Sequence, residues 1–97
     1  MGLERKIITV GSSAGVILPV YFVKAKKITN GDRITLKAYE FVVNKKVIKS
    51  TTPFTRKIIR FANSMGFTIP TGILKADGIK KGDFLVLRSF GIEKVGA

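Results

Sequence analysis

One serine in this sequence lies in a pattern that could support covalent chemistry. The run Gly11-Ser12-Ser13-Ala14-Gly15 matches the Gly-x-Ser-x-Gly turn that exposes a nucleophilic serine for acyl transfer. Such a serine needs a histidine to accept its proton, and the chain has no histidine and no cysteine. The six Asp and Glu residues are scattered singly, which argues against a carboxylate pair or a metal site. We therefore expect no enzymatic activity, no metal and no cofactor.

Cationic side chains are the chemistry that this sequence supplies in quantity. Eighteen Lys and Arg residues stand against six Asp and Glu residues, which gives a formal net charge of +12. Nine basic and three acidic residues lie in 1–48, and the same numbers lie in 49–97, so the charge belongs to the folded body and not to a basic tail. Such a field concentrates polyanions and opposes self-association. Nucleic acid is the commonest partner of this kind, followed by an anionic membrane surface.

Nothing in the sequence points to secretion or to a membrane. No run approaches the roughly 18 apolar residues of a membrane span, and the first residues do not resemble a secretory signal. Lys6 occupies the position where a myristoylation motif needs Ser or Thr. We expect a cytoplasmic, nucleoid-associated protein without a membrane partner. Abundant Lys together with the absence of Cys, His and Trp favours a heat-adapted, archaeal or viral host.

The chain contains two copies of one unit, related by an offset of 51 residues. The motif Arg5-Lys6-Ile7-Ile8 recurs as Arg56-Lys57-Ile58-Ile59, and 13 of the 32 positions from 5 to 36 are identical at this offset. Agreement of this extent is not produced by chance matching of β-rich segments. The repetition predicts one domain over 1–97 that consists of repeat one at 5–48, a linker at 49–55 and repeat two at 56–92.

Each repeat is expected to hold the same series of elements. The series is a strand, a polar turn that ends in glycine, a second strand, a helix of about two turns, and a third strand after a Gly-Asp turn. Pro19 and Pro70 suit the first position of the helix, where a missing N–H costs nothing. Gly15 and Gly66 suit either a positive φ or the close approach of another backbone segment. In repeat one the strands are expected at 7–10, 16–18 and 33–37, and in repeat two at 58–61, 67–69 and 84–87.

Residues 39–54 have no counterpart in repeat two. They contain two further expected strands, at 41–43 and 47–48, around a turn at 44–46. A single unit of this size cannot enclose a core, whereas two packed copies can. The sequence therefore predicts a mostly β fold with short helices in which both repeats share one core.

The order of these motifs resembles the AbrB/MazE/SpoVT family of swapped-hairpin DNA-binding domains, which occur in bacterial and archaeal regulators. The resemblance rests on Ser64-Met65-Gly66-Phe67-Thr68-Ile69-Pro70 with 79–84 behind it, and on 15–19 and 28–32 in repeat one. It covers about two thirds of the chain. It implies a swapped-hairpin AbrB-like β-barrel that forms as a single-chain pseudo-dimer. It also implies that the partner is double-stranded DNA and that the protein is a transcriptional regulator.

The resemblance also implies which residues contact DNA. Basic residues of the first strand and of the short helix meet DNA in this family, and Arg60, Lys24 and Lys75 keep that chemistry here, while Thr9 stands at the position of Arg60 in repeat one. From the residues alone we add the basic pairs beside the first strands and after the first helix, and the turn serines that can donate to phosphate or to a base edge. The full set is Arg5, Lys6, Ser13, Lys24, Lys26, Lys27, Arg56, Lys57, Arg60, Ser64 and Lys75.

Several alternatives stay open at this point. Because Arg is the commonest reader of guanine and few of the family's arginines are present, a non-specific architectural DNA-binding protein is the first alternative. An RNA-binding basic β-barrel module is the second, although its usual stacking aromatic residues fall mostly on apolar faces here. An antitoxin role is disfavoured, because 93–97 is short and not acidic. Further self-association of pseudo-dimers also stays open.

Overall fold

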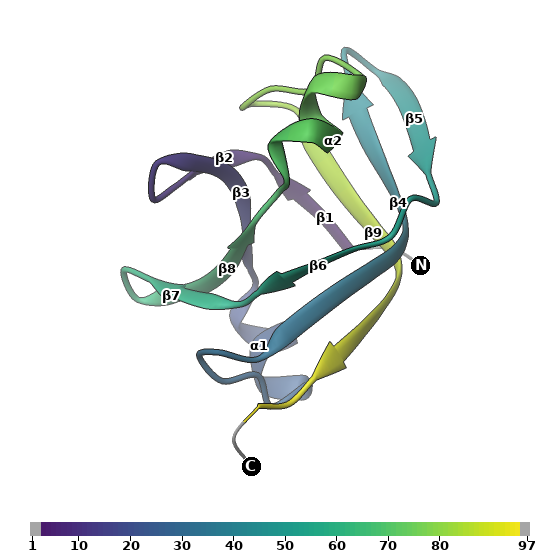
Figure 1. The fold of residues 1–97 in the computed structure, drawn as a ribbon. Coiled ribbons are helices and arrows are strands. Elements are labelled where there is room, and N and C mark those ends of the chain that lie inside the picture. Colours follow the sequence, from purple (N-terminus) through teal and green to yellow (C-terminus); the bar gives the residue numbers. More distant parts are fainter. Residues whose placement is uncertain (1–2, 96–97) are drawn as a thin grey trace.

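The structure, a computed structural model, describes residues 3–95 and consists mostly of β-strands with two short helices (Figure 1). This confirms the predicted composition of the fold. The helices are α1 (Val20–Ala25) and α2 (Thr71–Ala76). The strands are β1 (Leu3–Lys6), β2 (Ile8–Val10), β3 (Ser13–Leu18), β4 (Arg33–Val43), β5 (Lys46–Ser50), β6 (Phe54–Lys57), β7 (Ile59–Phe61), β8 (Ser64–Thr68) and β9 (Phe84–Glu93).

The strands form two sheets, and the two repeats exchange strands between them. The first strand of each repeat pairs antiparallel with the strand that follows the helix of the other repeat, β1 with β9 and β6 with β4. β4 and β9 also pair with each other, and β5 completes this five-stranded sheet. The four-stranded sheet has the order β2-β3-β8-β7, so that β3 and β8 of the two repeats pair at its centre. Neither repeat could therefore form either sheet alone.

In each repeat the chain passes directly from the five-stranded to the four-stranded sheet at one residue, and it returns through the helix. Ile7 and Ile58 are both completely buried. The N–H of Ile7 donates to the carbonyl of Asp83 at 2.8 Å, and its carbonyl accepts from Gly82 at 2.8 Å. In the other repeat, Ile58 makes the matching pair of bonds to residues 31 and 32, at 2.9 and 2.7 Å. Each Gly-Asp turn thus holds the crossing point of the opposite repeat.

The expectation of a closed barrel is wrong, because the strands form two open sheets. The crossing residues explain this difference. The backbones of Ile7 and Ile58 bond to turns and not to a neighbouring strand. The hydrogen bonds between strands are therefore interrupted where the chain leaves one sheet for the other, whereas a closed barrel needs them to continue from strand to strand.

The predicted turns were too long, and the glycines at their ends lie within strands. The two hairpins turn at 11–12 and 62–63, so Gly15 and Gly66 lie inside β3 and β8. A Cβ on Gly15 would lie 2.3 Å from the carbonyl oxygen of Phe67, and one on Gly66 would lie 2.4 Å from that of Val16. Of the two readings of these glycines, the close approach of another backbone is therefore correct.

Both helices begin one residue later than predicted, so each proline is the N-cap and not the first helical residue. The carbonyls of Pro19 and Pro70 still accept the first bonds of the helices, for example from Val23 at 3.0 Å. Each helix ends just before a residue with positive φ, Lys27 at 53° and Gly78 at 65°. This left-handed residue turns the chain toward the Gly-Asp turn.

Both repeats contribute to one core. It fills the space between the two sheets and includes six pairs of buried residues that match at the offset of 51. Tyr39, which has a polar group in this core, donates its hydroxyl to the carbonyl of Thr52 at 2.7 Å. The six pairs are Ile7 and Ile58, Val16 and Phe67, Leu18 and Ile69, Ile28 and Ile79, Ile34 and Leu85, and Leu36 and Leu87.

Candidate nucleic-acid interface

A groove lies between a helix of repeat one and a hairpin of repeat two. Its walls are α1 and the β7–β8 hairpin, and it has a volume of about 280 Å³. Three of the predicted DNA-contacting residues, Lys24, Arg60 and Ser64, meet there although they are distant in sequence. Asn63 joins them, and no carboxylate lines the groove. The apolar part of the lining is Leu18, Val20, Val23, Ile28 and Met65.

Arg60 is held on this groove by its backbone. It lies in the middle of β7, opposite Met65 of β8, and its N–H donates to the side-chain oxygen of Asn30 at 2.9 Å. Asn30 belongs to the loop that follows α1, so this bond ties the hairpin of repeat two to the helix of repeat one. The Arg60 side chain itself is exposed. Sequence reasoning missed Asn30, because the matching position of the other repeat holds Lys81 and not an asparagine.

The matching segments at the other end of the molecule are α2 and the β2–β3 hairpin. Ile69, just before α2, donates its N–H to the carbonyl of Ala14 in β3 at 2.9 Å, which extends the β3–β8 ladder toward the start of the helix. Lys75 and Ser13 are exposed here. Lys75 lies in the last turn of α2, as Lys24 does in α1.

Arg5 and Arg56 have a structural role that their charge did not predict. Both are half-buried. The Nε of Arg5 donates to the carbonyl of Ile17 at 2.7 Å, and the Nε of Arg56 donates to that of Thr68 at 3.1 Å. Arg56 also bonds the Thr68 hydroxyl. These two arginines hold β1 against β3 and β6 against β8, so part of each guanidinium is not available to DNA.

The other predicted basic residues do not line the groove. Lys6 and Lys57 are exposed on β1 and β6. The ammonium group of Lys26 lies 5.8 Å from the centre of the Phe90 ring, where the ring face attracts it. Lys27 uses its carbonyl to accept a bond from Lys94. The structure therefore brings together Lys24, Arg60 and Ser64 from the predicted set and places these four lysines on other surfaces.

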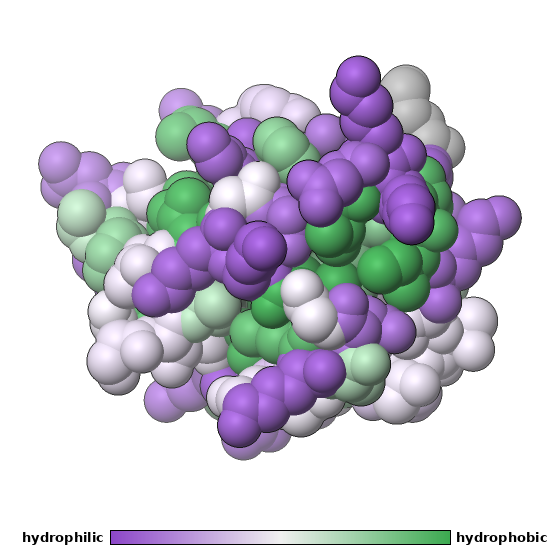
Figure 2. Space-filling model, turned by 90° about the horizontal axis from the view of Figure 1, so that it is seen from above, coloured by the Kyte–Doolittle hydropathy of each residue, from purple (hydrophilic) through white to green (hydrophobic). Residues whose placement is uncertain are grey.

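The positive charge of the molecule is largely uncompensated. All eighteen Lys and Arg residues are exposed or half-buried, and three of them form ion pairs within residues 3–95, to Glu93, Glu40 and Asp32. Seen from the end where α2 and β5 lie, hydrophilic side chains cover most of the surface and leave a strip of hydrophobic side chains between them (Figure 2). Unpaired charge at the surface keeps a long-range attraction for polyanions.

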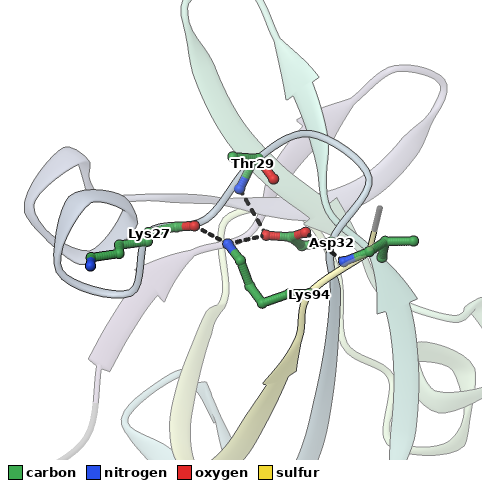
Figure 3. Close-up of polar contacts among 5 residues, drawn as sticks. Lys27, Thr29, Asp32 and Lys94 are labelled. Atoms are coloured by element: carbon green, nitrogen blue, oxygen red, sulfur yellow. Dashed lines mark hydrogen bonds and ion pairs between the residues drawn. The ribbon is translucent and has the colours of Figure 1, made fainter. Parts of the chain in front are cut away.

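Asp32 is a buried carboxylate with a different role (Figure 3). Its Oδ2 accepts from Lys94 Nζ at 2.6 Å and from the N–H of Thr29 at 2.8 Å, and its Oδ1 accepts from the N–H of Val95 at 3.1 Å. The bonds from Lys94 and Thr29 hold the pKa of the Asp32 carboxyl well below its usual range. Asp32 thus fixes the segment after β9 against repeat one and is fully occupied in doing so.

The Gly-x-Ser-x-Gly run does not adopt the geometry of a nucleophilic elbow. Ser13 begins β3 in a β-hairpin, whereas a nucleophilic elbow joins a strand to a helix. Within residues 3–95 no three His, Cys, Asp or Glu side chains gather as metal ligands would. None of the helices in that range is long and apolar enough to cross a membrane.

Comparison with protein-family models, with curated proteins and with solved structures found no match for this chain. Its function is therefore inferred from the charge and geometry of the molecule itself.

Proposed function

We propose that this protein binds double-stranded DNA and acts as a transcriptional regulator of AbrB type, in which one chain forms a swapped-hairpin pseudo-dimer. The observation that carries the proposal is the groove where Lys24 of repeat one meets Arg60 of repeat two on a surface of net positive charge. A surface assembled from both repeats is what a pseudo-dimer would use on a duplex. Association with the nucleoid and the absence of catalysis belong to the same proposal.

The exchange of strands supports the pseudo-dimer. In a swapped arrangement each repeat completes the sheet of the other, and here β1 pairs with β9 and β6 with β4. The dimensions fit a duplex as well. The longest extent of the molecule is 38 Å, while one turn of B-DNA is about 34–36 Å. With α1 and α2 toward opposite ends (Figure 1), both helices could contact one turn of DNA.

The chemistry of the groove suits the roles proposed. Arg60 is the residue type that reads guanine through two hydrogen bonds in the major groove. Lys24 and Lys75 end their helices with exposed ammonium groups, which suit phosphates. Ser13 and Ser64 lie at the hairpin turns, where a hydroxyl can donate to a phosphate or to a base edge.

The aromatic residues favour duplex DNA over single-stranded RNA. Modules that bind single strands present exposed aromatic rings on which bases stack. Four of the nine aromatic residues here are buried in the core, and four more are half-buried. Tyr21 is the exposed one, and it lies on α1 and not on a sheet.

The proposal is tested by fluorescence anisotropy with three labelled probes, namely genomic duplex fragments, a random duplex and single-stranded RNA, each titrated at two salt concentrations. A regulator should bind its site roughly 10³-fold more tightly than random duplex and should prefer duplex to RNA. Equal affinity for all duplexes with a steep salt dependence would instead indicate the architectural alternative. Preference for RNA, or no duplex binding at low salt, would refute the proposal.

A further inference from the structure

The two ends of the proposed DNA-binding surface have the same architecture and different side chains. We call the surface of α1 and the β7–β8 hairpin the α1 end, and the surface of α2 and the β2–β3 hairpin the α2 end. Each combines a helix from one repeat with a hairpin from the other, and their positions correspond at the offset of 51. Four of these positions hold Lys24, Arg60, Asn63 and Ser64 at the α1 end, and Lys75, Thr9, Ser12 and Ser13 at the α2 end.

The hairpin residues differ in what they can recognise. Arg60 and Asn63 at the α1 end are exposed, and Arg and Asn are the residue types that make paired hydrogen bonds to guanine and to adenine. Thr9 and Ser12 replace them at the α2 end. A hydroxyl can make one bond to a phosphate or to either base, so it discriminates poorly. Residues for paired base contacts are therefore found on the α1 hairpin and not on its counterpart.

The two helices also differ in the side chains that they expose. Val20 and Tyr21 open α1 with 62% and 69% of their surface exposed, although a solvated helix face usually carries polar residues. Val20 also lines the groove beside Arg60. The matching residues of α2 are Thr71 and Gly72, which have little apolar surface. Exposed apolar side chains beside base-reading groups suit the methyl group of thymine.

The lysines at the α2 end are Lys75 and, in the loop after α2, Lys80 and Lys81, which stand where repeat one has Thr29 and Asn30. The α1 end has as many lysines, because Lys26 and Lys27 stand where the α2 end has Asp77 and Gly78, so the ends differ in their hairpin side chains and not in their number of lysines. Lys81 thus stands at the position of the asparagine that secures the Arg60 backbone. Ammonium groups without a neighbouring Arg or Asn suit the phosphate backbone, which carries no sequence information.

We propose, on the basis of the duplex-binding function above, that the α1 end reads bases and the α2 end holds phosphates. The target is then an asymmetric duplex with a single specific half-site and no palindrome. Arg60 and Asn63 are the specificity-determining residues, and the apolar start of α1 adds contact beside them.

The test is selection from a pool of random duplexes, followed by affinity measurements on the selected sequence. Wild-type protein should yield one conserved half-site with unconserved flanking sequence. Arg60→Thr, which installs the residue of repeat one, should lower the preference for the selected sequence over random duplex roughly 5- to 150-fold, the range expected for one paired Arg–guanine contact. Thr9→Arg together with Ser12→Asn should add a second, inverted half-site.

Arg88→Ala is the matched control, because Arg88 is an exposed arginine on β9 of the five-stranded sheet, paired with Glu40. It should leave the preference unchanged. Melting curves of all variants exclude loss of fold as the cause. A palindromic consensus from the wild type would overturn the asymmetry while leaving duplex binding established. So would an Arg60→Thr protein whose affinity falls by the same factor for every duplex, because its preference would then be intact. Failure of the wild type to select any duplex would instead overturn the proposed function.

Discussion

Alanine at Gly15 or Gly66 should destabilise the protein strongly, because the central strands β3 and β8 approach each other most closely there. The added Cβ would lie 2.3 Å from the Phe67 carbonyl oxygen or 2.4 Å from that of Val16. Carbon–oxygen contacts between strands are ordinarily about 3.3–3.6 Å, so the backbones would have to separate by about 1 Å. Since the obstructing atoms are main-chain atoms, no side-chain rotation relieves the overlap.

The magnitude follows from the cost of overpacking. Extra methyl groups in a well-packed core cost about 1–3 kcal/mol, and a clash with backbone belongs at the upper limit of that range. For a domain of 60–100 residues each kcal/mol lowers the Tm by roughly 4–8 °C. Each variant should therefore melt roughly 12–24 °C below the wild type.

Thermal unfolding followed by circular dichroism measures this, with Gly72→Ala as the matched control. Gly72 is exposed in α2, and a Cβ built on it meets no atom within 4 Å. Because alanine is favoured over glycine in a helix by about 1 kcal/mol, this variant should melt slightly above the wild type. If Gly15→Ala and Gly66→Ala melted with the wild type, β3 and β8 would not pair in this register, and the interleaving of the repeats would lose its central contact.

The remaining predictions concern the surface and the segment after β9. Arg60→Ala and Lys75→Ala should each weaken duplex binding in anisotropy titrations with almost unchanged Tm, since both side chains are exposed, and loss of the Lys75 phosphate contact should reduce the salt slope by about 1. Unchanged binding by the double variant would show that the surface lies elsewhere. Lys94→Ala should lower the Tm, because it leaves the buried Asp32 carboxylate with backbone donors alone. The lowered pKa of Asp32 means that its contribution to stability is complete above its unfolded pKa of about 3.9 and is lost as the pH falls below that value. Asp32→Asn should therefore have a Tm deficit at neutral pH that shrinks below about pH 4, and a deficit independent of pH would contradict this role.

The periodicity of the sequence predicted the shared core well, because burial selects the same residue type at equivalent positions. Ile7 and Ile58, or Leu18 and Ile69, match at the offset of 51 and are buried alike. The partners of the strands were less accessible from the residues alone. The segment at Arg5 was predicted to lie beside the first strand and not in one, because its pairing with β9 depends on the whole fold. Closure was predicted wrongly because nothing local marks Ile7 as a crossing point.

The candidate site was likewise predicted only in part. Their charge predicted that Lys24 and Arg60 lie at the surface, and the repeat assigned them to different halves of the chain. Charge could not predict the direction of a side chain, so Arg5 was assigned to DNA although its Nε bonds the carbonyl of Ile17. The bond of Lys94 to Asp32 could not be predicted from the repeat, because the residue 51 positions before Lys94 is Val43, which lies at the end of β4.

The differences between the repeats have a physical rationale in their covalent connection. In a symmetric homodimer every surface substitution appears twice, so the two halves of a DNA-binding surface stay identical. Two repeats in one chain are free of that constraint at the surface, while the shared core still requires matching shapes. The pattern here follows that division, with Gly15 and Gly66 identical at the close approach of the strands and Thr9 and Arg60 different on the exposed hairpins. A duplex target without two-fold symmetry is the kind of partner to which such a surface can adapt.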